Sequence, residues 1–414
     1  MAAANASTYD PVIREIWPND EIVEETYDVN QTIYGLISKD TTFKEKVRHV
    51  PISYGMTGGA SASFAAAKAN KQPSVLAEFK ITPVKYYSLF SIDRSTLERT
   101  KDNKAALVSA LDREPKMAIQ RWARSTGIYL AGDGTGVLAQ GSAINSATIT
   151  LANAKTIKFF EQGITCELSA TADGTGIKFS QQPLRVASVD REAGTVTFTV
   201  PVTTAVPTAA ATDYIYIAGD AGAVVTGVYG FVPTTAPGST LFFGLDRSKD
   251  PQRLGGWRVK CGGLSPRASA MKMAAVLHEN QGKPSHYFLS PSDYLSLQLE
   301  LQSTSALKMI KEPGAKIGKH SYGEPFEGIS FVGPAGEIKC FFDINVKDNN
   351  PLMLTLDDWV FASMNEVPHF DESDGNYILR EGDADAHEGR LVSDHQLYTR
   401  APGRSGIGLL ATSS

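Results

Sequence analysis

The chain has 414 residues, of which 42% are hydrophobic and 21% charged, an ordinary globular composition with enough length for two or three domains. Its formal net charge of -5 argues against a surface built to neutralise nucleic-acid phosphates, because that task needs an excess of lysine and arginine. Neither a signal-peptide pattern nor an apolar run of about 18 residues occurs, which predicts a soluble protein made in the cytosol, without a membrane partner.

The three cysteines, Cys166, Cys261 and Cys340, lie far apart in the sequence. They lack the CxxC spacing of zinc sites, and their odd number does not fit a disulfide framework. We therefore expect free, buried thiols in a reducing compartment.

Residues 1–46 are predicted to form an N-terminal arm. This segment carries acidic and aromatic side chains, among them Trp17, with little sustained periodicity. Such a composition suits a segment whose apolar residues pack on something other than its own core.

Residues 47–92 are predicted to form an extended hairpin loop. Val47–Tyr54 and Leu76–Ile92 are rich in β-branched and aromatic residues, which favours strands, whereas the stretch between them is mostly glycine, alanine and serine, with Lys68 and Lys71. Two strands that stand away from a core bury too little surface to be stable alone. The hairpin therefore needs a neighbour to cover it.

Residues 93–146 are predicted to form a domain around one long amphipathic helix, Lys104–Leu130. Positions on three-, four- and seven-residue steps share one face of this helix: Leu107, Leu111, Ala118, Trp122, Ser125 and Tyr129. Pro115 predicts a kink or a break, because proline lacks the backbone donor and restricts the residue before it. The glycines of the AGDGTG sequence that follows are expected to end the helix.

Residues 147–226 change character and are predicted to form an inserted β domain. Short runs alternate apolar and polar residues, and turn sequences such as ADGTG and DREAG separate them. Closely spaced strands of this kind favour a small antiparallel barrel or sandwich.

Residues 227–378 are predicted to form a crossing segment and a mixed α/β domain. Two serine–proline pairs, Ser265 with Pro266 and Ser290 with Pro291, are typical helix starts, since a serine N-cap often precedes a proline in the first turn. The runs HYFLS, ISFVGP, IKCFFDI and LMLTLDDWVFASM favour strands. The runs YILRE and LVSDHQLYTR, in residues 379–414, complete the set of predicted strands.

The glycines Gly132, Gly134 and Gly136 are spaced like part of a dinucleotide-binding loop. Such a loop must follow a strand and open a helix, so that the helix N-terminus faces the pyrophosphate. Here the glycines follow a helix, and we therefore predict a helix-ending turn and no bound cofactor.

The segment Glu366–Glu388 is rich in carboxylates. A calcium loop that starts at Asp383 would place His387 where an oxygen ligand belongs and Glu388 where the loop requires glycine. We therefore favour a solvated or inter-subunit acidic surface, and a bound cation is the alternative.

The sequence shows only incomplete patterns of catalytic residues. The GRSGIG sequence lacks the second glycine of a GxSxG motif, and the histidines show no HExxH pairing. The sequence predicts a protein that is not an enzyme, with no catalytic residue, no cofactor and no metal site.

Several of these features occur in an order that resembles the major capsid protein of tailed bacteriophages, which has the Hong Kong 97-like shell fold. They are the acidic arm, the long hairpin, the long helix ending in GDGTG, and the sequences SHYFLSPSDYLSLQLEL, GISFVGPAGEIKCFFDIN and HEGRLVSDHQLYTRAPG. The resemblance covers the chain apart from the β insertion.

The resemblance implies an α+β fold with an N-terminal arm, an extended β-hairpin loop and a peripheral domain that contains a long spine helix. It also implies an axial domain at the capsomer centre, with the last strands returning to the peripheral domain and a small antiparallel β domain inserted. The implied function is that of a structural capsid protein, which assembles in the host cytoplasm into hexamers and pentamers of an icosahedral head. The virion would enclose double-stranded DNA without sequence-specific binding.

The implied partners are many copies of the same chain, a portal and a scaffolding protein. The scaffolding protein is expected to be a separate chain, because only a short arm precedes the hairpin. The resemblance leaves open whether a decoration protein binds.

Some capsid proteins of this family join a hairpin lysine to an asparagine, assisted by a glutamate. In this sequence Glu381 stands where the asparagine is expected, and Glu388 matches neither partner. Lys68 and Lys71 are therefore expected to form no covalent bond, and burial would hold the shell together. These four residues and Trp17 are the predicted inter-subunit contacts.

Two other classes of function fit the sequence. An encapsulin-like compartment would form small empty shells that house cargo enzymes. An oligomeric surface or carbohydrate-binding module, led by the β insertion, would remain a small oligomer with a protease-sensitive hairpin.

Overall fold

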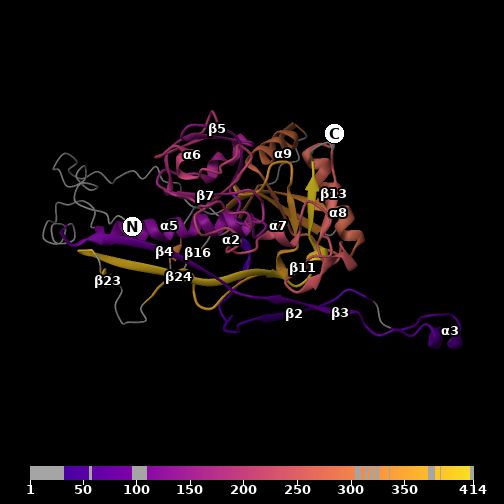
Figure 1. Ribbon diagram of the computed structural model, residues 1–414. Coiled ribbons are helices and arrows are strands. Elements are labelled where there is room, and N and C mark those ends of the chain that lie inside the picture. Colours follow the sequence, from indigo (N-terminus) through magenta and orange to yellow (C-terminus); the bar gives the residue numbers. More distant parts are fainter. Residues whose placement is uncertain are drawn as a thin grey trace. The chain divides into compact units, whose positions relative to one another are not determined.

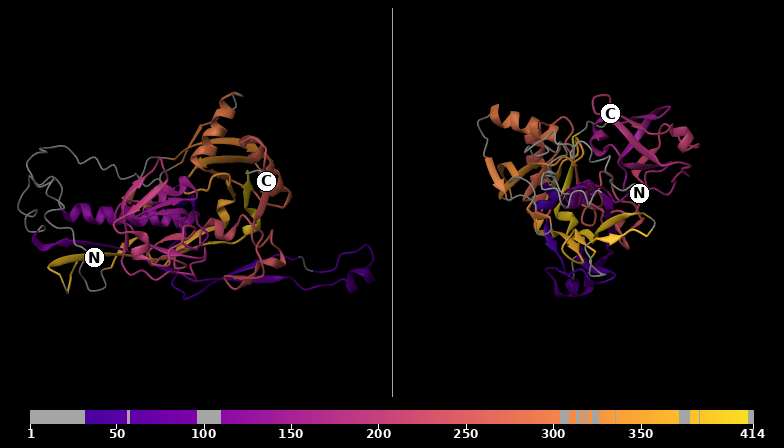
Figure 2. Two further views of the ribbon diagram at one scale, coloured as in Figure 1. Left: turned by 45° about the horizontal axis from the view of Figure 1, so that its top comes forward. Right: turned by 90° about the vertical axis from the view of Figure 1, so that its left-hand side faces the viewer.

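The computed structural model describes residues 32–55, 58–95, 110–303, 309–312, 316–317, 320–321, 326–334, 336–371, 378–382 and 384–410. The chain divides into two compact units: Ile128–Gly230 forms one, and the parts before and after it in sequence form the other (Figures 1 and 2). None of the helices among the described residues combines the length and the apolar character needed to cross a membrane.

A six-stranded sheet in the larger unit is built around its longest strand, β24 (Ala386–Thr399). The ten residues of β4 (Val84–Asp93) pair antiparallel with one edge of β24. The other edge pairs with three shorter strands in turn: β21 (Trp359–Ser363), β22 (His369–Phe370) and β23 (Leu379–Arg380). Strand β1 (Ser38–Asp40), which follows helix α2 (Thr32–Leu36), pairs parallel with β21.

The long helix α5 (Ala110–Ala131) packs on this sheet. Ala118, Trp122, Ser125 and Tyr129 are buried, as the helical spacing predicts, while Leu107 and the side chain of Leu111 lie outside what the structure describes. Of the two alternatives predicted at Pro115, the break is wrong, because one helix runs through this residue, and the kink stays a prediction. Proline removes a single donor, and the buried face beyond it keeps the helix on the sheet.

Strands β2 (Arg48–Ser53) and β3 (Leu76–Ile81) form the predicted hairpin, with Arg48 opposite Ile81. The predicted second strand, Leu76–Ile92, is in fact two strands, because the chain leaves the hairpin after Ile81 and β4 then joins the six-stranded sheet. Pro83 lies at this break, where its missing backbone donor is tolerated.

Beside β3 lies a small ribbon made by β11 (Leu241–Phe242) and β12 (Leu245–Asp246), followed by the 3-10 turn η2 (Arg247–Lys249).

A mixed seven-stranded sheet forms the other layer of the larger unit, in the order β13-β25-β20-β14-β19-β18-β15. The strands are β13 (Trp257–Lys260), β14 (His286–Leu289), β15 (Met309–Glu312), β18 (Phe326–Gly333), β19 (Gly336–Phe342), β20 (Leu352–Leu354) and β25 (Gly406–Leu409). Two further short strands, β16 (Lys316–Ile317) and β17 (His320–Ser321), pair with each other, and the 3-10 turn η4 (Pro402–Arg404) precedes β25.

Helices α8 (Pro266–Glu279) and α9 (Pro291–Ser303) pack on this sheet around a core that includes Met273, Leu277 and Tyr287. Both predicted helix starts are confirmed, since the hydroxyl of Ser265 accepts from the Ala268 N–H at 3.3 Å and that of Ser290 accepts from the Asp293 N–H at 3.2 Å.

The segment predicted as one strand, LMLTLDDWVFASM, is two strands in different sheets. The 3-10 turn η3 (Leu356–Asp358) separates β20 from β21, and the chain thereby passes from one sheet to the other. Every residue of both strands is buried, and the two aspartates of the turn, Asp357 and Asp358, mark the interruption but not the change of sheet.

The smaller unit contains a closed barrel in the order β10-β5-β6-β9-β8-β7. Its strands are β5 (Ala139–Asn145), β6 (Thr148–Leu151), β7 (Thr165–Ser169), β8 (Leu184–Asp190), β9 (Thr195–Phe198) and β10 (Tyr214–Ile217), with η1 (Ala154–Phe159) and α6 (Val202–Ala205) between strands and α7 (Val228–Phe231) at its end. Strand β5 precedes residue 147 and belongs to the barrel although its sequence, AQGSAIN, has little apolar alternation. Gly134 and Gly136 have φ values of 92° and 83°, which confirms the helix-ending turn after α5.

Candidate assembly surfaces

The inner part of the hairpin is covered by the chain's own residues. Val50, Ile52, Phe79 and Ile81 are buried on one side of β2 and β3. The ring of Phe79 makes edge contacts with Phe231 and with Phe242, with ring centres 6.1 and 6.2 Å apart. The expectation that a single copy leaves the whole hairpin uncovered therefore needs correction, because only the outer part is exposed.

Hydrogen bonds hold the stem of the hairpin, β2 and β3, at both of its ends. The Lys80 N–H, near the base, donates to the Phe243 carbonyl at 2.8 Å, and the Arg253 guanidinium donates to the Tyr54 carbonyl, at the outer end, at 2.5 Å. These contacts fix the stem, from which the outer part is presented.

The outer part of the hairpin, residues 58–76, has a different environment. Helix α3 (Phe64–Ala69) contains no buried residue, and its Phe64 side chain is 84% exposed. Leu76, at the start of β3, is 69% exposed. A six-residue helix without a packed face has little stability of its own, so this tip requires a partner surface.

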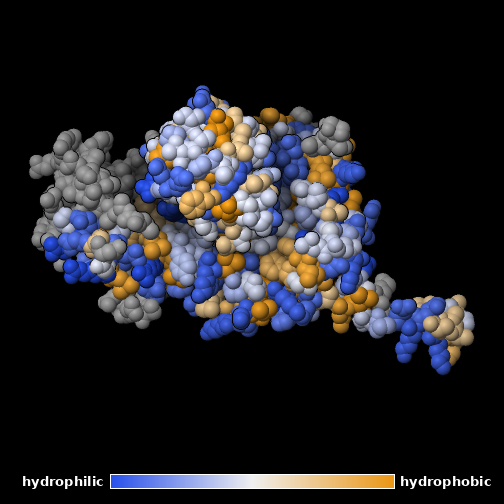
Figure 3. All heavy atoms as spheres, in the orientation of Figure 1, coloured by the Kyte–Doolittle hydropathy of each residue, from blue (hydrophilic) through white to orange (hydrophobic). Residues whose placement is uncertain are grey.

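The hairpin tip also carries positive charge. Lys68 and Lys71 are exposed, and no aspartate or glutamate occurs between Gly55 and Ala77. Figures 1 and 3 show the tip, around α3, with hydrophobic and hydrophilic surface side by side. The tip therefore combines exposed apolar groups with a positive charge, which suits an acidic partner surface with an apolar patch.

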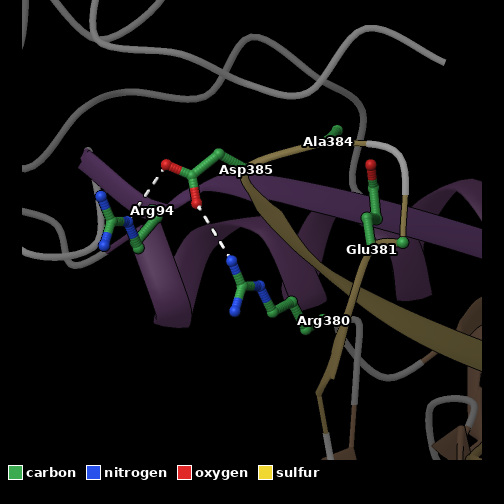
Figure 4. A pocket seen from close by; sticks show the side chains of 6 residues that line it. Arg94, Arg380, Glu381, Ala384 and Asp385 are labelled. Carbon is green, nitrogen blue, oxygen red and sulfur yellow. Dashed lines mark hydrogen bonds and ion pairs between the residues drawn. The ribbon is translucent and has the colours of Figure 1, made fainter.

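A second candidate surface lies where β4, β23 and β24 end. A shallow cleft of about 670 Å³ is lined by Arg94, Arg380, Glu381, Gly382, Ala384 and Asp385 (Figure 4). Both arginines point toward the Asp385 carboxylate: Arg94 Nε lies 3.1 Å from it and Arg380 Nη2 lies 4.0 Å from it.

Glu381 and Glu388, predicted as inter-subunit contacts, come together at this end of β4 and β24. Ser91 on β4 donates a hydrogen bond to Glu381 and lies opposite Glu388 in the strand register. Glu388 also pairs with Arg390, with 2.5 Å between Oε1 and Nε. The structure thus brings the two glutamates together.

Lys68 and Lys71, by contrast, lie on the hairpin tip and make no described contact with Glu381 or Glu388. Figure 1 shows α3 and β23 at the ends of two different strand pairs. Trp17 and Asp383 lie outside the described residues. The calcium loop weighed from Asp383 is wrong, because residues 386–394 of it belong to the extended strand β24 and pair with β4. In the part of the chain that the structure describes, no three histidine, cysteine or carboxylate side chains are placed to hold a metal ion.

Sequence reasoning missed Phe64 and Arg94, and it named Asp385 only as one carboxylate of the acidic segment Glu366–Glu388. Phe64 is a lone aromatic residue in a stretch of small ones, and this contrast was the available signal. Arg94 and Asp385 carry no local signal, because only the pairing of Asp93 with Ala386 across β4 and β24 brings them together.

The cysteines are free and buried, as the sequence predicts. Burial raises the pKa of Cys166 to about 12 and also raises the pKa of Cys340. Both thiols therefore stay protonated near neutral pH, and a protonated thiol is a poor nucleophile.

Comparison with known proteins gives a match at the level of structure. No protein-family profile and no curated relative matches the sequence. The capsid of cyanophage A-1(L) matches with a TM-score of 0.53 and 11% identity, covering 98% of this chain and 99% of that one. The capsid of a native GTA particle has a TM-score of 0.45 at 9% identity, covering 95% of each chain. The SrpI encapsulin of Synechococcus elongatus PCC 7942 has a TM-score of 0.47 at 8% identity, covering 100% of each.

The match to the cyanophage protein extends over nearly the whole of both chains. The α+β fold that the sequence resemblance implied is confirmed: this chain has the fold of a bacteriophage capsid protein.

Proposed function

We propose that this chain is the major capsid protein of a tailed bacteriophage, a structural subunit that assembles with copies of itself into a closed shell. The observation that carries the proposal is the correspondence of fold with the cyanophage A-1(L) capsid over 98% of the chain. Low identity between the two sequences is compatible with this function, because shell formation depends on shape and on buried surface between copies rather than on a few catalytic residues.

The hairpin is proposed to hold neighbouring copies of the chain together. Its stem is fixed on the chain's own aromatic residues, whereas Phe64, Val75 and Leu76 are exposed near its tip. In the shell these apolar side chains would be covered by a neighbouring copy. Burying them would supply most of the attraction, at about 25 cal/mol for each Å² of apolar surface removed from water.

The acidic partner of the tip is proposed to be the β23–β24 end of a neighbouring copy. Lys68 and Lys71 bring positive charge. At that end Asp385 is paired with Arg94 and Arg380 and Glu388 is paired with Arg390, so Glu381, which accepts a hydrogen bond from Ser91, is the carboxylate proposed to face the lysines. Trp17, in the N-terminal arm, is a further proposed contact. No covalent link is proposed, because a lysine and a glutamate held together by charge need none.

The other parts of the chain receive roles that follow the resemblance. Residues 1–46 act as the arm, residues 93–146 with 379–414 as the peripheral domain, and residues 227–378 as the crossing segment and the axial domain. Hexamers and pentamers of the chain would build an icosahedral head that encloses double-stranded DNA in the virion. A separate scaffolding protein and a portal would take part in assembly in the host cytoplasm.

Electron microscopy of the purified chain tests the proposal. The unchanged protein should form closed shells or rings of five and six copies. A variant with Phe64→Ser and Leu76→Ser should lose them, because both substitutions remove exposed apolar surface from the outer part of the hairpin and leave the buried side chains of the stem, such as Phe79, in place. Phe179→Ser is the matched control, since Phe179 lies in the smaller unit and is 80% exposed.

Three outcomes would contradict the proposal. One is a protein that remains a compact monomer at all concentrations. Another is a small oligomer unaffected by the tip variant, which would favour a binding module. The third is a uniform small shell that retains a foreign enzyme as cargo, which would favour an encapsulin-like compartment.

A further inference from the structure

A cluster of four aromatic rings joins four elements of the larger unit. Tyr34 comes from α2, Trp122 from α5, Phe361 from β21 and His395 from β24. The His395 ring centre lies 5.1 Å from that of Phe361 and 6.0 Å from that of Trp122. The Tyr34 ring lies 5.2 Å from Phe361 and 6.2 Å from Trp122, so it completes the cluster.

His395 differs from the other rings of this cluster because it can take up a proton near neutral pH. The residue is 2% exposed, and its Nδ1 atom has no hydrogen-bond partner among the described residues. A charge placed on this ring would therefore be buried without compensation, which is costly.

The charged groups around the cluster do not offer a counter-ion to His395. Asp394, its neighbour on β24, lies on the opposite face of the strand and is paired in register with Lys85 of β4. On the far side of Tyr34, the Lys39 Nζ atom sits 4.5 Å from the ring centre, which adds a cation rather than an anion. Val84 of β4 and Ser363 of β21 lie opposite His395 in the register.

The long helix α5 also offers His395 no carboxylate. The residues one turn from Trp122 on its buried side, Ala118, Ser125 and Thr126, are uncharged. The nearest charged residues of α5, Arg121 and Arg124, are more exposed and are cations. Burial alone lowers the pKa of His395 to about 4.

Helix α2 connects this cluster to the seven-stranded sheet. The Thr32 hydroxyl donates to the Phe342 carbonyl at 2.9 Å, and the Ile33 N–H donates to the Asp343 carboxylate at 3.1 Å. Tyr34, on the same short helix, contacts Trp122 and Phe361. Helix α2 therefore contacts both sheets of the larger unit and helps to hold them together.

We propose that His395 makes this cluster a proton-sensitive joint. With a neutral ring, α2 and α5 are held on the six-stranded sheet. When the ring is charged, the cluster opens. Helix α2 then loses its ring contacts in the cluster and its hydrogen bonds to the seven-stranded sheet. Helix α2 is thereby released in mildly acidic solution while the two sheets stay folded.

The direction of the pH effect follows from the pKa values of His395 in the closed cluster and of an exposed histidine. The folded pKa of His395, about 4, lies below the value of 6.5 for an exposed histidine, so the closed joint is fully favoured above pH 6.5 and loses this advantage as the pH falls toward 4. Between pH 7 and pH 5 the equilibrium constant for opening should rise on the order of 20-fold.

Hydrogen exchange of the full-length chain, read by mass spectrometry at pH 7 and pH 5 and corrected for the intrinsic rate, tests the proposal. Peptides from residues 32–37 and 116–127 should lose protection on the order of 20-fold at pH 5, whereas barrel peptides from residues 139–217 should not change. A His395→Phe variant, which keeps a ring and cannot charge, should hold its protection at pH 5. His387→Phe, on the same strand, is the matched control and should behave like the unchanged chain.

The measurement on the unchanged chain tests the proposal even if the His395→Phe variant fails to fold. Equal protection of residues 32–37 at both pH values would overturn the proposal. So would a loss spread evenly over both units, or a loss that persists in His395→Phe.

Discussion

The indole N–H of Trp122 donates a hydrogen bond of 2.8 Å to the hydroxyl of Ser393, inside the core of the larger unit. The same hydroxyl donates to the Tyr86 carbonyl at 3.2 Å. One serine thus links the long helix to both strands of the longest pair in the six-stranded sheet, and the position of α5 depends on this contact as well as on apolar packing.

Ser393→Ala should lower the free energy of unfolding of the larger unit by about 2 kcal/mol, because the buried indole N–H loses its acceptor. Denaturation in urea, followed by Trp fluorescence, measures the change. A Trp122→Phe and Ser393→Ala double variant should lose less than the sum of the two single variants, since phenylalanine has no donor to leave unsatisfied. Strict additivity would show that the contact contributes nothing.

Phe79→Ala should detach the hairpin stem. Phe79 is fully buried and its ring contacts Phe231 and Phe242, so its truncation should cost about 3 kcal/mol locally. Limited proteolysis should then cut the chain between residues 48 and 81 much faster than in the unchanged protein. Tyr87→Ala, at an exposed position of β4, is the control and should leave the cleavage rate as it was.

Charge reversal at the tip should weaken assembly. Lys68→Glu with Lys71→Glu would set the tip against an acidic neighbouring surface, and the concentration needed for shell formation should rise at least tenfold at low salt. Light scattering across a concentration series measures this threshold. Lys68→Gln with Lys71→Gln should give a smaller rise, and an equal effect of the two variants would argue against an acidic partner.

The barrel contains a buried ion pair whose loss should destabilise the smaller unit. Lys178 Nζ lies 2.7 Å from the Asp213 carboxylate, and the two side chains are only 14% and 5% exposed. Lys178→Met leaves a buried carboxylate without its cation and should cost about 3 kcal/mol. Adding Asp213→Leu should recover most of this loss in a thermal melt. If the double variant is less stable than the single one, the cost comes from packing and not from the charge.

All three thiols should resist modification in the native protein. Burial raises the pKa of Cys166, Cys261 and Cys340 and hides their sulfur atoms. A maleimide reagent at pH 8 should label none of them within minutes and all three after unfolding in guanidinium. Rapid labelling of any one thiol would place it at the surface.

Local sequence signals were sufficient to predict many of the helices and strands. Serine caps at Ser265 and Ser290 and the helical spacing around Trp122 are short-range features, and the structure agrees with each. The order in which the hairpin, the long helix and the later strands follow along the chain was enough to suggest the fold, and the match to the cyanophage A-1(L) capsid agrees with it.

The pairing of strands that lie far apart in the sequence could not be predicted from local signals. The chain changes sheet after Ile81 and again at Leu356. Thr82–Pro83 and Asp357–Asp358 interrupt the strand-like runs at these two places, but such short interruptions do not say which sheet the next strand joins. Strand β5 shows little alternation, so its place in the barrel depends on partners that are far away in the sequence. The cleft around Asp385 likewise exists only through the register of β4 and β24.

Hydrogen exchange of residues 58–76 in the assembled and the dissociated protein is the most direct test of the account. The outer hairpin has exposed apolar side chains and a helix without a buried face, so its amides should exchange almost freely in the isolated subunit and become strongly protected on assembly. Strong protection of these residues in the isolated subunit, or free exchange in assembled particles, would contradict the claim that neighbouring copies cover the hairpin.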